Sequence, residues 1–190
     1  MKKIVVLLSF LSVGFINAQA FKGKGDIKGQ VGANFQSGGT GITVSSDFGI
    51  GANMSFGFTA TYLLNVPNIV QRLDETEFLQ NNPNFDPIIS GTVPQTTIEP
   101  SFGDRFDLKA RFNANIGDVF KLDSKMDVYP GLDLGLRNFG AHLGVRYFFT
   151  DGFGVYAEGG TPLARYKTNL SDFDYMNNQF VFVLGASFNL

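Results

Sequence analysis

The chain has 190 residues, with 15 Lys and Arg against 17 Asp and Glu, and its formal net charge is −2 at pH 7. This length suits a single domain, and a slightly acidic chain without a basic patch gives no reason to expect a nucleic-acid partner. Cysteine is absent, which excludes disulfides and thiolate chemistry. The 23 Gly and 21 Phe, without any Trp, favour closely packed β-strands over helices.

The N-terminal residues show the three zones of a secretory signal peptide. Two lysines form a basic start, an apolar run covers residues 4–16, and small residues follow at a cleavage site. The apolar run is too short to span a bilayer. We expect residues 1–20 to be removed by cleavage after Ala20, with Ala18 as the alternative, so that residues 21–190 form the mature domain.

Alternation of apolar and polar residues with a period of two recurs along the rest of the chain and predicts eight strands. Eight is an even number and the smallest that single-chain bacterial outer-membrane barrels use. Most of the predicted strands have about nine to twelve residues, which is the length that a tilted strand needs to cross the hydrocarbon layer. The predicted strands are residues 26–36, 42–50, 54–64, 105–117, 126–137, 141–149, 155–160 and 179–190.

Two long interruptions separate these strands, and we expect both on the extracellular side. Residues 65–103 hold five of the seven prolines and read as a loop, with a helical turn around residues 70–79. Residues 161–178 form the second loop. Within a predicted strand, Pro130 lacks a backbone donor, so we expect a bulge or a strand start at residues 129–131.

The stretch RFDLKARFNANIG, residues 105–117, shows the question that alternation leaves open. Every second residue from Phe106 to Ile116 is apolar, and the residues between them carry charged or amide side chains. A soluble sheet would bury the apolar face, whereas a membrane barrel would turn that face to lipid. The same letters therefore fit two opposite architectures.

The polar faces of the predicted strands hold nearly equal numbers of basic and acidic residues. In an eight-stranded barrel the interior is just filled by side chains, so these groups would interlock as a buried ion-pair network. In a soluble sheet they would simply face water. The expected members of the network are Lys28, Arg105, Lys109, Arg111, Arg137 and Arg146 with Asp47, Asp107, Asp127, Asp133 and Glu158.

Aromatic residues on the apolar faces gather near the predicted strand ends. A soluble barrel would have to pack these rings into a lumen too narrow for them, whereas a membrane barrel carries two aromatic girdles. The sequence therefore predicts an all-β, eight-stranded antiparallel up-and-down transmembrane β-barrel. The expected girdles are Phe35, Tyr62, Phe106 and Phe180 at one end, and Phe48, Tyr147, Phe149 and Phe188 at the other.

In these features the chain resembles the small outer-membrane β-barrel families of Gram-negative bacteria, those similar to the membrane domain of OmpA and to OmpX, over residues 26–190. The closing strand looks like a C-terminal assembly signal, which usually ends in Phe, whereas here Phe188 stands two residues before the final Leu190. The motifs NAQA and YFFTDGFGVYAE look like those of small barrels of Bacteroidota. The resemblance implies a monomer in the outer membrane whose partners are outer-membrane lipid and the assembly machinery, without a cofactor or a metal.

The predicted function is a non-enzymatic outer-membrane protein with a plugged polar lumen and a structural or surface-interaction role through its extracellular loops. One alternative is a lipid-modifying envelope enzyme, because some eight-stranded barrels pair a His with a Ser two residues on. Here the only histidine, His142, is followed at that position by Gly144, so catalysis is not expected. The other alternative is a soluble exported barrel that binds an apolar ligand in its interior.

Overall fold

The computed structural model describes residues 19–72, 75–84, 95–167 and 173–190. Residues 1–18, which hold most of the predicted signal peptide, therefore lie outside the described residues. In the part of the chain that is described, no helix combines the length and the apolar character needed to cross a membrane.

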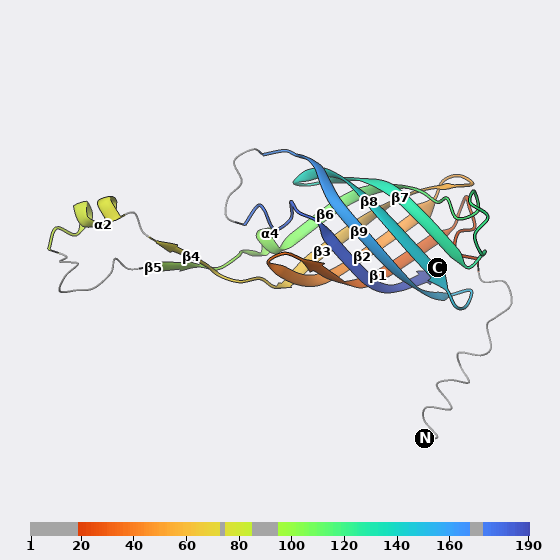
Figure 1. Ribbon diagram of the computed structural model, residues 1–190, viewed down its shortest axis with the longest axis horizontal. Helices are drawn as coiled ribbons and strands as arrows, with labels where there is room; N and C mark the ends of the chain where they lie inside the picture. Colours follow the sequence, from red (N-terminus) through yellow and green to blue (C-terminus); the bar gives the residue numbers. More distant parts are fainter. Residues whose placement is uncertain (1–18, 73–74, 85–94, 168–172) are drawn as a thin grey trace, which may run out of the picture.

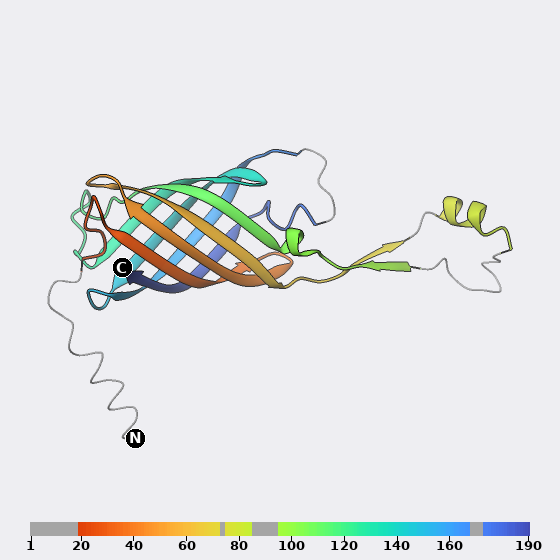
Figure 2. The same cartoon turned by 180° about the vertical axis from the view of Figure 1, so that it is seen from behind.

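Eight antiparallel strands close into a barrel, and each strand pairs with its neighbours along the chain (Figures 1 and 2). The barrel closes where the first strand pairs with the last, from Lys28 opposite Asn189 to Gln36 opposite Val181. This arrangement confirms the predicted all-β, eight-stranded up-and-down barrel. The barrel strands are β1 (Ile27–Gln36), β2 (Gly39–Gly49), β3 (Met54–Asn65), β6 (Phe106–Ala114), β7 (Met126–Gly135), β8 (Asn138–Phe148), β9 (Phe153–Arg165) and β10 (Val181–Asn189).

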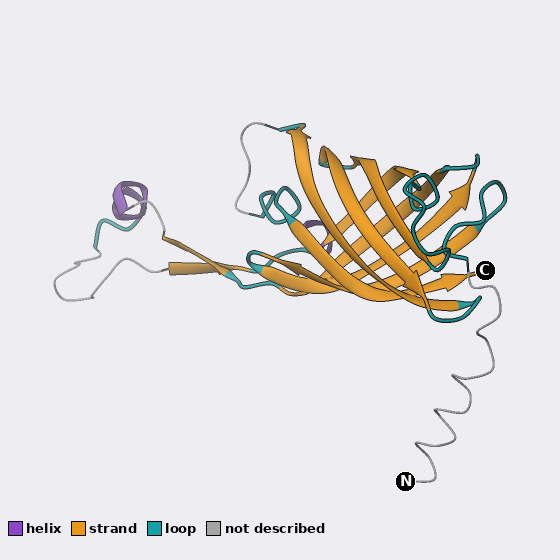
Figure 3. Ribbon diagram, turned by 45° about the vertical axis from the view of Figure 1, so that its right-hand side comes forward, coloured by secondary structure: helices purple, strands orange, loops and turns teal. Residues whose placement is uncertain are grey.

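The connections between strands differ in length at the two ends of the barrel (Figure 3). The loop end carries the β1–β2, β3–β6, β7–β8 and β9–β10 connections, which include the two longest. The terminal end carries the three other connections and the C-terminus. The last long connection begins after Arg165 and not at Thr161, because β9 continues through Pro162.

The β3–β6 connection contains α2, which overlaps the helical turn predicted around residues 70–79, and further regular structure that the sequence did not predict. It holds β4 (Ile69–Arg72), α2 (Glu75–Asn81), β5 (Gln95–Ile98) and α4 (Phe102–Arg105). Strands β4 and β5 pair with each other as an antiparallel hairpin, and together with α2 they form an arm that projects from the loop end (Figure 1). Strands of four residues are too short for alternation to be recognised in a proline-rich segment.

A capping box sets the boundary between the arm and the barrel. The Ser101 hydroxyl accepts a hydrogen bond from the Asp104 backbone N–H, and the Asp104 carboxylate accepts one from the Ser101 backbone N–H. This box fixes the start of α4, and the Arg105 backbone N–H donates to the Ser101 carbonyl at 3.3 Å within the helical turn. The prediction that Arg105 starts the strand is wrong, because the helical turn includes this residue and β6 begins at Phe106.

Pro130 lies inside β7, which runs through it without a bulge and pairs Pro130 with Leu143 of β8. On its other side, the paired part of β6 and β7 ends at Asn113 opposite Gly131. The prediction of a bulge or a strand start is therefore wrong. The missing N–H of Pro130 interrupts the pairing of β7 with β6, while the strand and its pairing with β8 continue.

Side chains alternate between the two faces of the barrel wall, with apolar residues outside and polar residues inside. Val44, Phe58 and Leu132 are 52%, 49% and 46% exposed, whereas Arg111 and Arg146 are at most 2% exposed. The interior is thus lined by charged and amide groups. A soluble barrel that binds an apolar ligand inside does not fit this lining.

Aromatic rings on the outer face cluster toward both ends. At the loop end the Phe102 ring stacks on Phe106 with centroids 5.5 Å apart, and it also lies 5.5 Å from the Tyr62 ring. At the terminal end the Phe153 ring lies 5.7 Å from the ring of Phe188, on neighbouring strands. Phe102 is a member of the loop-end group that the sequence did not predict, because it belongs to α4.

Candidate functional site

Arg111 is the centre of a set of ion pairs inside the barrel. Its guanidinium Nη2 lies 2.7 Å from Glu158 Oε2, and its Nε lies 3.8 Å from Asp47 Oδ1 and 4.0 Å from Asp133 Oδ1. These residues come from β6, β9, β2 and β7, and the alternation of each strand turns them inward. One buried arginine therefore joins four strands around the lumen.

A second buried arginine, Arg146 of β8, extends this set toward the terminal end. Its Nη2 lies 2.8 Å from Asp127 Oδ2 and donates a hydrogen bond of 2.6 Å to Asn115 Oδ1. Its Nη1 lies 3.8 Å from Asp47 Oδ2, so that Asp47 stands between the two arginines. The guanidinium carbon lies 4.6 Å from the centroid of the Tyr129 ring, a cation–π contact. The central cluster comprises Arg111, Arg146, Asp47, Asp127, Asp133, Glu158, Tyr129 and His142.

His142 is a buried member of the central cluster. Its Nδ1 lies 3.0 Å from Asp133 Oδ1, and its Nε2 lies 2.8 Å from Asn113 Oδ1. Directly opposite, a Cβ at Gly131 would collide with the imidazole, so the ring fits only against glycine. The polar partners are a carboxylate and an amide, with no Ser, Thr or Cys among them, and the apolar outer surface lies on the other side of the strand. The ring therefore links β8 to β7 and β6.

The N-terminal described residues cover the terminal end of the lumen. Phe21 lies with its ring 5.9 Å from the Arg146 guanidinium, and the buried Ala20 packs on Phe148. Next to them, Lys28 Nζ lies 2.6 Å from Asp26 Oδ2 and 5.2 Å from the centroid of the Phe148 ring. Apolar and charged groups together fill this end.

A segment that precedes β10, residues 173–179, crosses the loop end of the lumen and is called the cap segment. Gln36 Nε2 donates to the Met176 carbonyl at 2.6 Å, and Asn138 Nδ2 donates to the Asn177 carbonyl at 2.7 Å. Asn177 Nδ2 in turn donates to the Asp104 carbonyl at 2.7 Å. The cap segment is thus held by β1, by the start of β8 and by α4. Its apolar side chains pack in a buried group made of Leu63, Val66, Phe173 and Met176.

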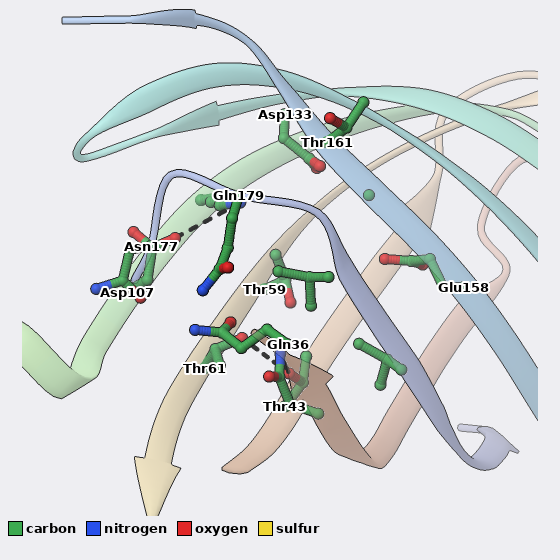
Figure 4. A pocket seen from close by; sticks show the side chains of 15 residues that line it. Gln36, Thr43, Thr59, Thr61, Asp107, Asp133, Glu158, Thr161, Asn177 and Gln179 are labelled. Atoms are coloured by element: carbon green, nitrogen blue, oxygen red, sulfur yellow. Dashed lines mark hydrogen bonds and ion pairs between the residues drawn. The ribbon is translucent and has the colours of Figure 1, made fainter. Parts of the chain in front are cut away.

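Between the cap segment and the central cluster lies a polar cavity of about 50 Å³, called the chamber (Figure 4). A cavity of this size holds a few waters. On one wall the Thr43 and Thr61 hydroxyls are 2.8 Å apart, and Asp107 Oδ2 lies 3.5 Å from Lys109 Nζ. The chamber lining includes Asn34, Gln36, Thr43, Thr59, Thr61, Asp107, Lys109, Asp133, Glu158, Thr161, Asn177 and Gln179.

The structure brings nine of the eleven predicted network residues into the lumen and leaves two outside it. Arg105 donates to the carbonyls of Pro100 and Leu64, each at 3.3 Å. Arg137 lies in the β7–β8 turn and forms a 2.9 Å ion pair with Asp174. Both arginine side chains therefore make their contacts at the loop end. Arg105 lies in α4 and Arg137 lies in a turn, so neither has the strand geometry that would direct its side chain into the lumen.

The lumen also holds polar residues that the predicted network omitted. Alternation could have identified Asn113 on the inward face of β6 and Tyr129 on the inward face of β7. It could also have identified Asn115, which continues the inward series just beyond the end of β6. Asp26 stands at the start of the predicted strand 26–36 with the same parity as Lys28, so alternation could have included it as well. Among the described lumen residues other than His142, six carboxylates meet four cations. These are Asp26, Asp47, Asp107, Asp127, Asp133 and Glu158 with Lys28, Lys109, Arg111 and Arg146.

Within the described residues, no three His, Asp or Glu side chains converge in a way that would hold a metal ion by themselves.

Phe188 lies in β10 and pairs with Gly29 of β1, so it takes part in barrel closure. Leu190 follows the strand, and its backbone N–H donates to the Ile27 carbonyl at 3.0 Å. The two residues expected in an assembly signal therefore stand at the seam between the first and last strands.

A model for a family of unknown function, DUF6646, matches residues 10–84 and 84–190. No curated protein matches the chain. The chain is similar to a structure described as "De novo design of transmembrane beta-barrels", with 6% identity and a TM-score of 0.47 over 89% of this chain and 98% of that chain. It is also similar to the solution NMR structure of Outer Membrane Protein G from Pseudomonas aeruginosa, with 10% identity and a TM-score of 0.38 over 90% and 99% of the two chains. Since the family model matches nearly the whole sequence, this protein belongs to the family of unknown function DUF6646.

Proposed function

We propose that this protein is an integral outer-membrane β-barrel without enzymatic activity, which anchors its loop-end surface in the outer leaflet. The observation that carries the proposal is the inverted distribution of side chains: buried arginines inside and apolar residues outside. The apolar outer face would be unstable in water, because soluble proteins rarely expose contiguous apolar patches larger than a few hundred Å². A closed barrel satisfies its backbone hydrogen bonds internally, as the bilayer requires.

Strand length and the aromatic residues support the same proposal. The barrel strands have nine to thirteen residues, enough for a tilted crossing of the hydrocarbon layer. Aromatic rings at both ends suit the two membrane interfaces. On this proposal the N-terminal signal directs export, and the protein is a monomer surrounded by outer-membrane lipid. Its cellular location is then the same as that of the OmpA-like and OmpX-like barrels and of the small barrels of Bacteroidota that its sequence resembles.

The proposal is tested by fractionation together with gel migration. The full chain is expressed in a Gram-negative host, and its membranes are separated and washed with alkaline carbonate. We expect the protein in the washed outer membrane, with faster migration on a gel before boiling than after it. Recovery in the periplasmic extract without a shift on heating would contradict the proposal.

We further propose that the lumen is plugged and does not conduct solutes. The support is the sequence of three barriers along the axis: the cap segment, the central cluster and the N-terminal residues near Phe21. Arg111, through Glu158 of β9, and Arg146, through Asp47 of β2, bridge the lumen between strands that are not neighbours, and the chamber is a cavity of only about 50 Å³. Any interaction function then belongs to the loop end and the arm.

The closing strand is proposed to act as the signal that the outer-membrane assembly machinery reads. Phe188 on the outer face of β10 and the terminal Leu190 support this, because they stand where the barrel is sealed. Phe188→Ala is expected to lower the amount of heat-modifiable protein in the outer membrane, while Leu190→Phe should leave that amount equal or higher. An unchanged amount in Phe188→Ala would argue against the signal.

A further inference from the structure

The described residues that precede β1 cross the mouth of the lumen at the terminal end. Gly23 and Gly25 have positive φ angles of 84° and 87° in a tight turn, and the Gly25 backbone N–H donates to the Gly49 carbonyl at the end of β2, at 2.8 Å. On the other side of this turn, the Ala20 backbone N–H donates to the Ser124 carbonyl at 2.7 Å, just before β7 begins. Because three strands separate β1 from β7 in either direction around the barrel, the segment reaches from one wall to the opposite one.

Ala20 anchors the far end of this segment, residues 19–22, which is called the strap. Ala20 is 1% exposed and packs on Phe148, an inward-facing residue at the end of β8 that is itself fully buried. The next residue, Phe21, is also buried, and its ring lies 5.9 Å from the Arg146 guanidinium. One backbone hydrogen bond and two buried apolar side chains therefore hold the strap in place.

The two signal cleavage sites that the sequence allows would leave different mature chains. A cut after Ala20 removes this residue, so that its backbone hydrogen bond and its cover over Phe148 are lost. It also places the new α-ammonium group on the buried Phe21, beside a guanidinium, and burying a charge without a partner is costly. A cut after Ala18 keeps the whole strap and places the ammonium group on Gln19, which is only half-buried.

We infer that the signal peptide ends at Ala18 and that the mature chain begins at Gln19, with the strap as a built-in closure of the terminal end of the lumen. Ala18 has the small side chain that the cleaved bond requires. Cleavage is a hydrolysis in which water adds across the Ala18–Gln19 amide and leaves a carboxylate on Ala18 and an ammonium group on Gln19. Signal peptidases cut the exported chain before it folds, so the barrel does not direct the cut, but only this product contains every contact of the strap. This cleavage presupposes the proposed export of the chain.

The cleavage site is tested by expressing the full chain in a Gram-negative host and purifying it from the fraction of the cell envelope that contains it. Mass spectrometry of the intact protein and of its N-terminal peptide identifies the first residue, and we expect Gln19. A chain that begins at Phe21 would overturn the inferred site, and so would a chain that keeps Met1. A periplasmic chain that begins at Gln19 would contradict the proposed membrane location but would leave the cleavage site standing.

The closing role of the strap is tested without export, on chains released from a cleavable tag and folded in detergent micelles. The chain that begins at Gln19 should unfold at a temperature about 2–4 °C or more above that of the chain that begins at Phe21. In the longer chain, Ala20→Glu places a charge against Phe148 and should lower the unfolding temperature. Gln19→Glu is the matched control, because it adds the same charge at a half-buried position and should leave that temperature unchanged. Equal unfolding temperatures of the two chains, or an equal loss in the two variants, would overturn the closing role of the strap.

Discussion

Arg111 and Glu158 form an ion pair of 2.7 Å although their strands, β6 and β9, are separated by two other strands in the order of the barrel. The pair therefore crosses the lumen instead of following the wall. Because Arg111 also approaches Asp47 and Asp133, one side chain holds three carboxylates in place. This bridge is the part of the central cluster on which the proposed plugged lumen and its stability most depend.

Replacing Arg111 with Met should destabilise the barrel by about 3–5 kcal/mol, because it leaves buried carboxylates without their partner. The measurement is the free energy of unfolding in urea, for protein folded into lipid vesicles. Leu108→Met, on the outer face of the same strand, is the control and should change this free energy by less than about 1.5 kcal/mol. A larger loss in the control would mean that the faces of β6 are reversed.

Gly144→Ala should destabilise the barrel by about 1–3 kcal/mol, because the added methyl group would collide with the Tyr129 ring in the filled lumen. Gly159→Ala is the control: its methyl group would lie on the outer face, in ordinary contact with Phe180 at 3.4 Å. Urea unfolding of the two variants distinguishes them. Equal stability would indicate that the lumen near Tyr129 has unfilled space.

In planar bilayers the wild-type barrel should show negligible conductance, since the central cluster fills the lumen. Asn138→Ala removes hydrogen bonds to the cap segment and should also remain closed, because the cluster lies beneath the cap segment. Stable single-channel steps in the wild-type protein would disprove the plugged lumen. Steps seen only in Asn138→Ala would assign the barrier to the cap segment alone.

The arm should be separable from the barrel by proteolysis of intact cells. Strands β4 and β5 pair only with each other, so cutting between them removes no strand from the barrel sheet. After cleavage we expect the remaining protein to stay in the outer membrane and to keep its heat-modifiable migration. Loss of that migration would show that the arm is needed for the folded barrel.

The sequence predicted those parts of the fold in which apolar and polar residues alternate regularly. Alternation assigned the eight barrel strands and the inward direction of Asp47, Arg111 and Arg146, because a strand has only two faces. It failed at Arg105, which lies in the helical turn of α4, and at β4 and β5, which are too short to show a period. The ion-pair partners could not be predicted, since contacts such as Arg111 with Glu158 depend on the register of strands far apart in the chain.

The orientation of the barrel wall is tested most directly by fluorescence quenching, since the natural chain has no Trp. Val155→Trp and Tyr156→Trp each introduce a single tryptophan at neighbouring positions of β9, the first on the outer face and the second in the lumen. Heat-modifiable migration verifies that each variant is folded in vesicles of lipids with brominated acyl chains. We predict strong quenching in the Val155→Trp variant and weak quenching in the Tyr156→Trp variant; the reverse order, or no quenching in either, would contradict a barrel whose apolar face meets lipid.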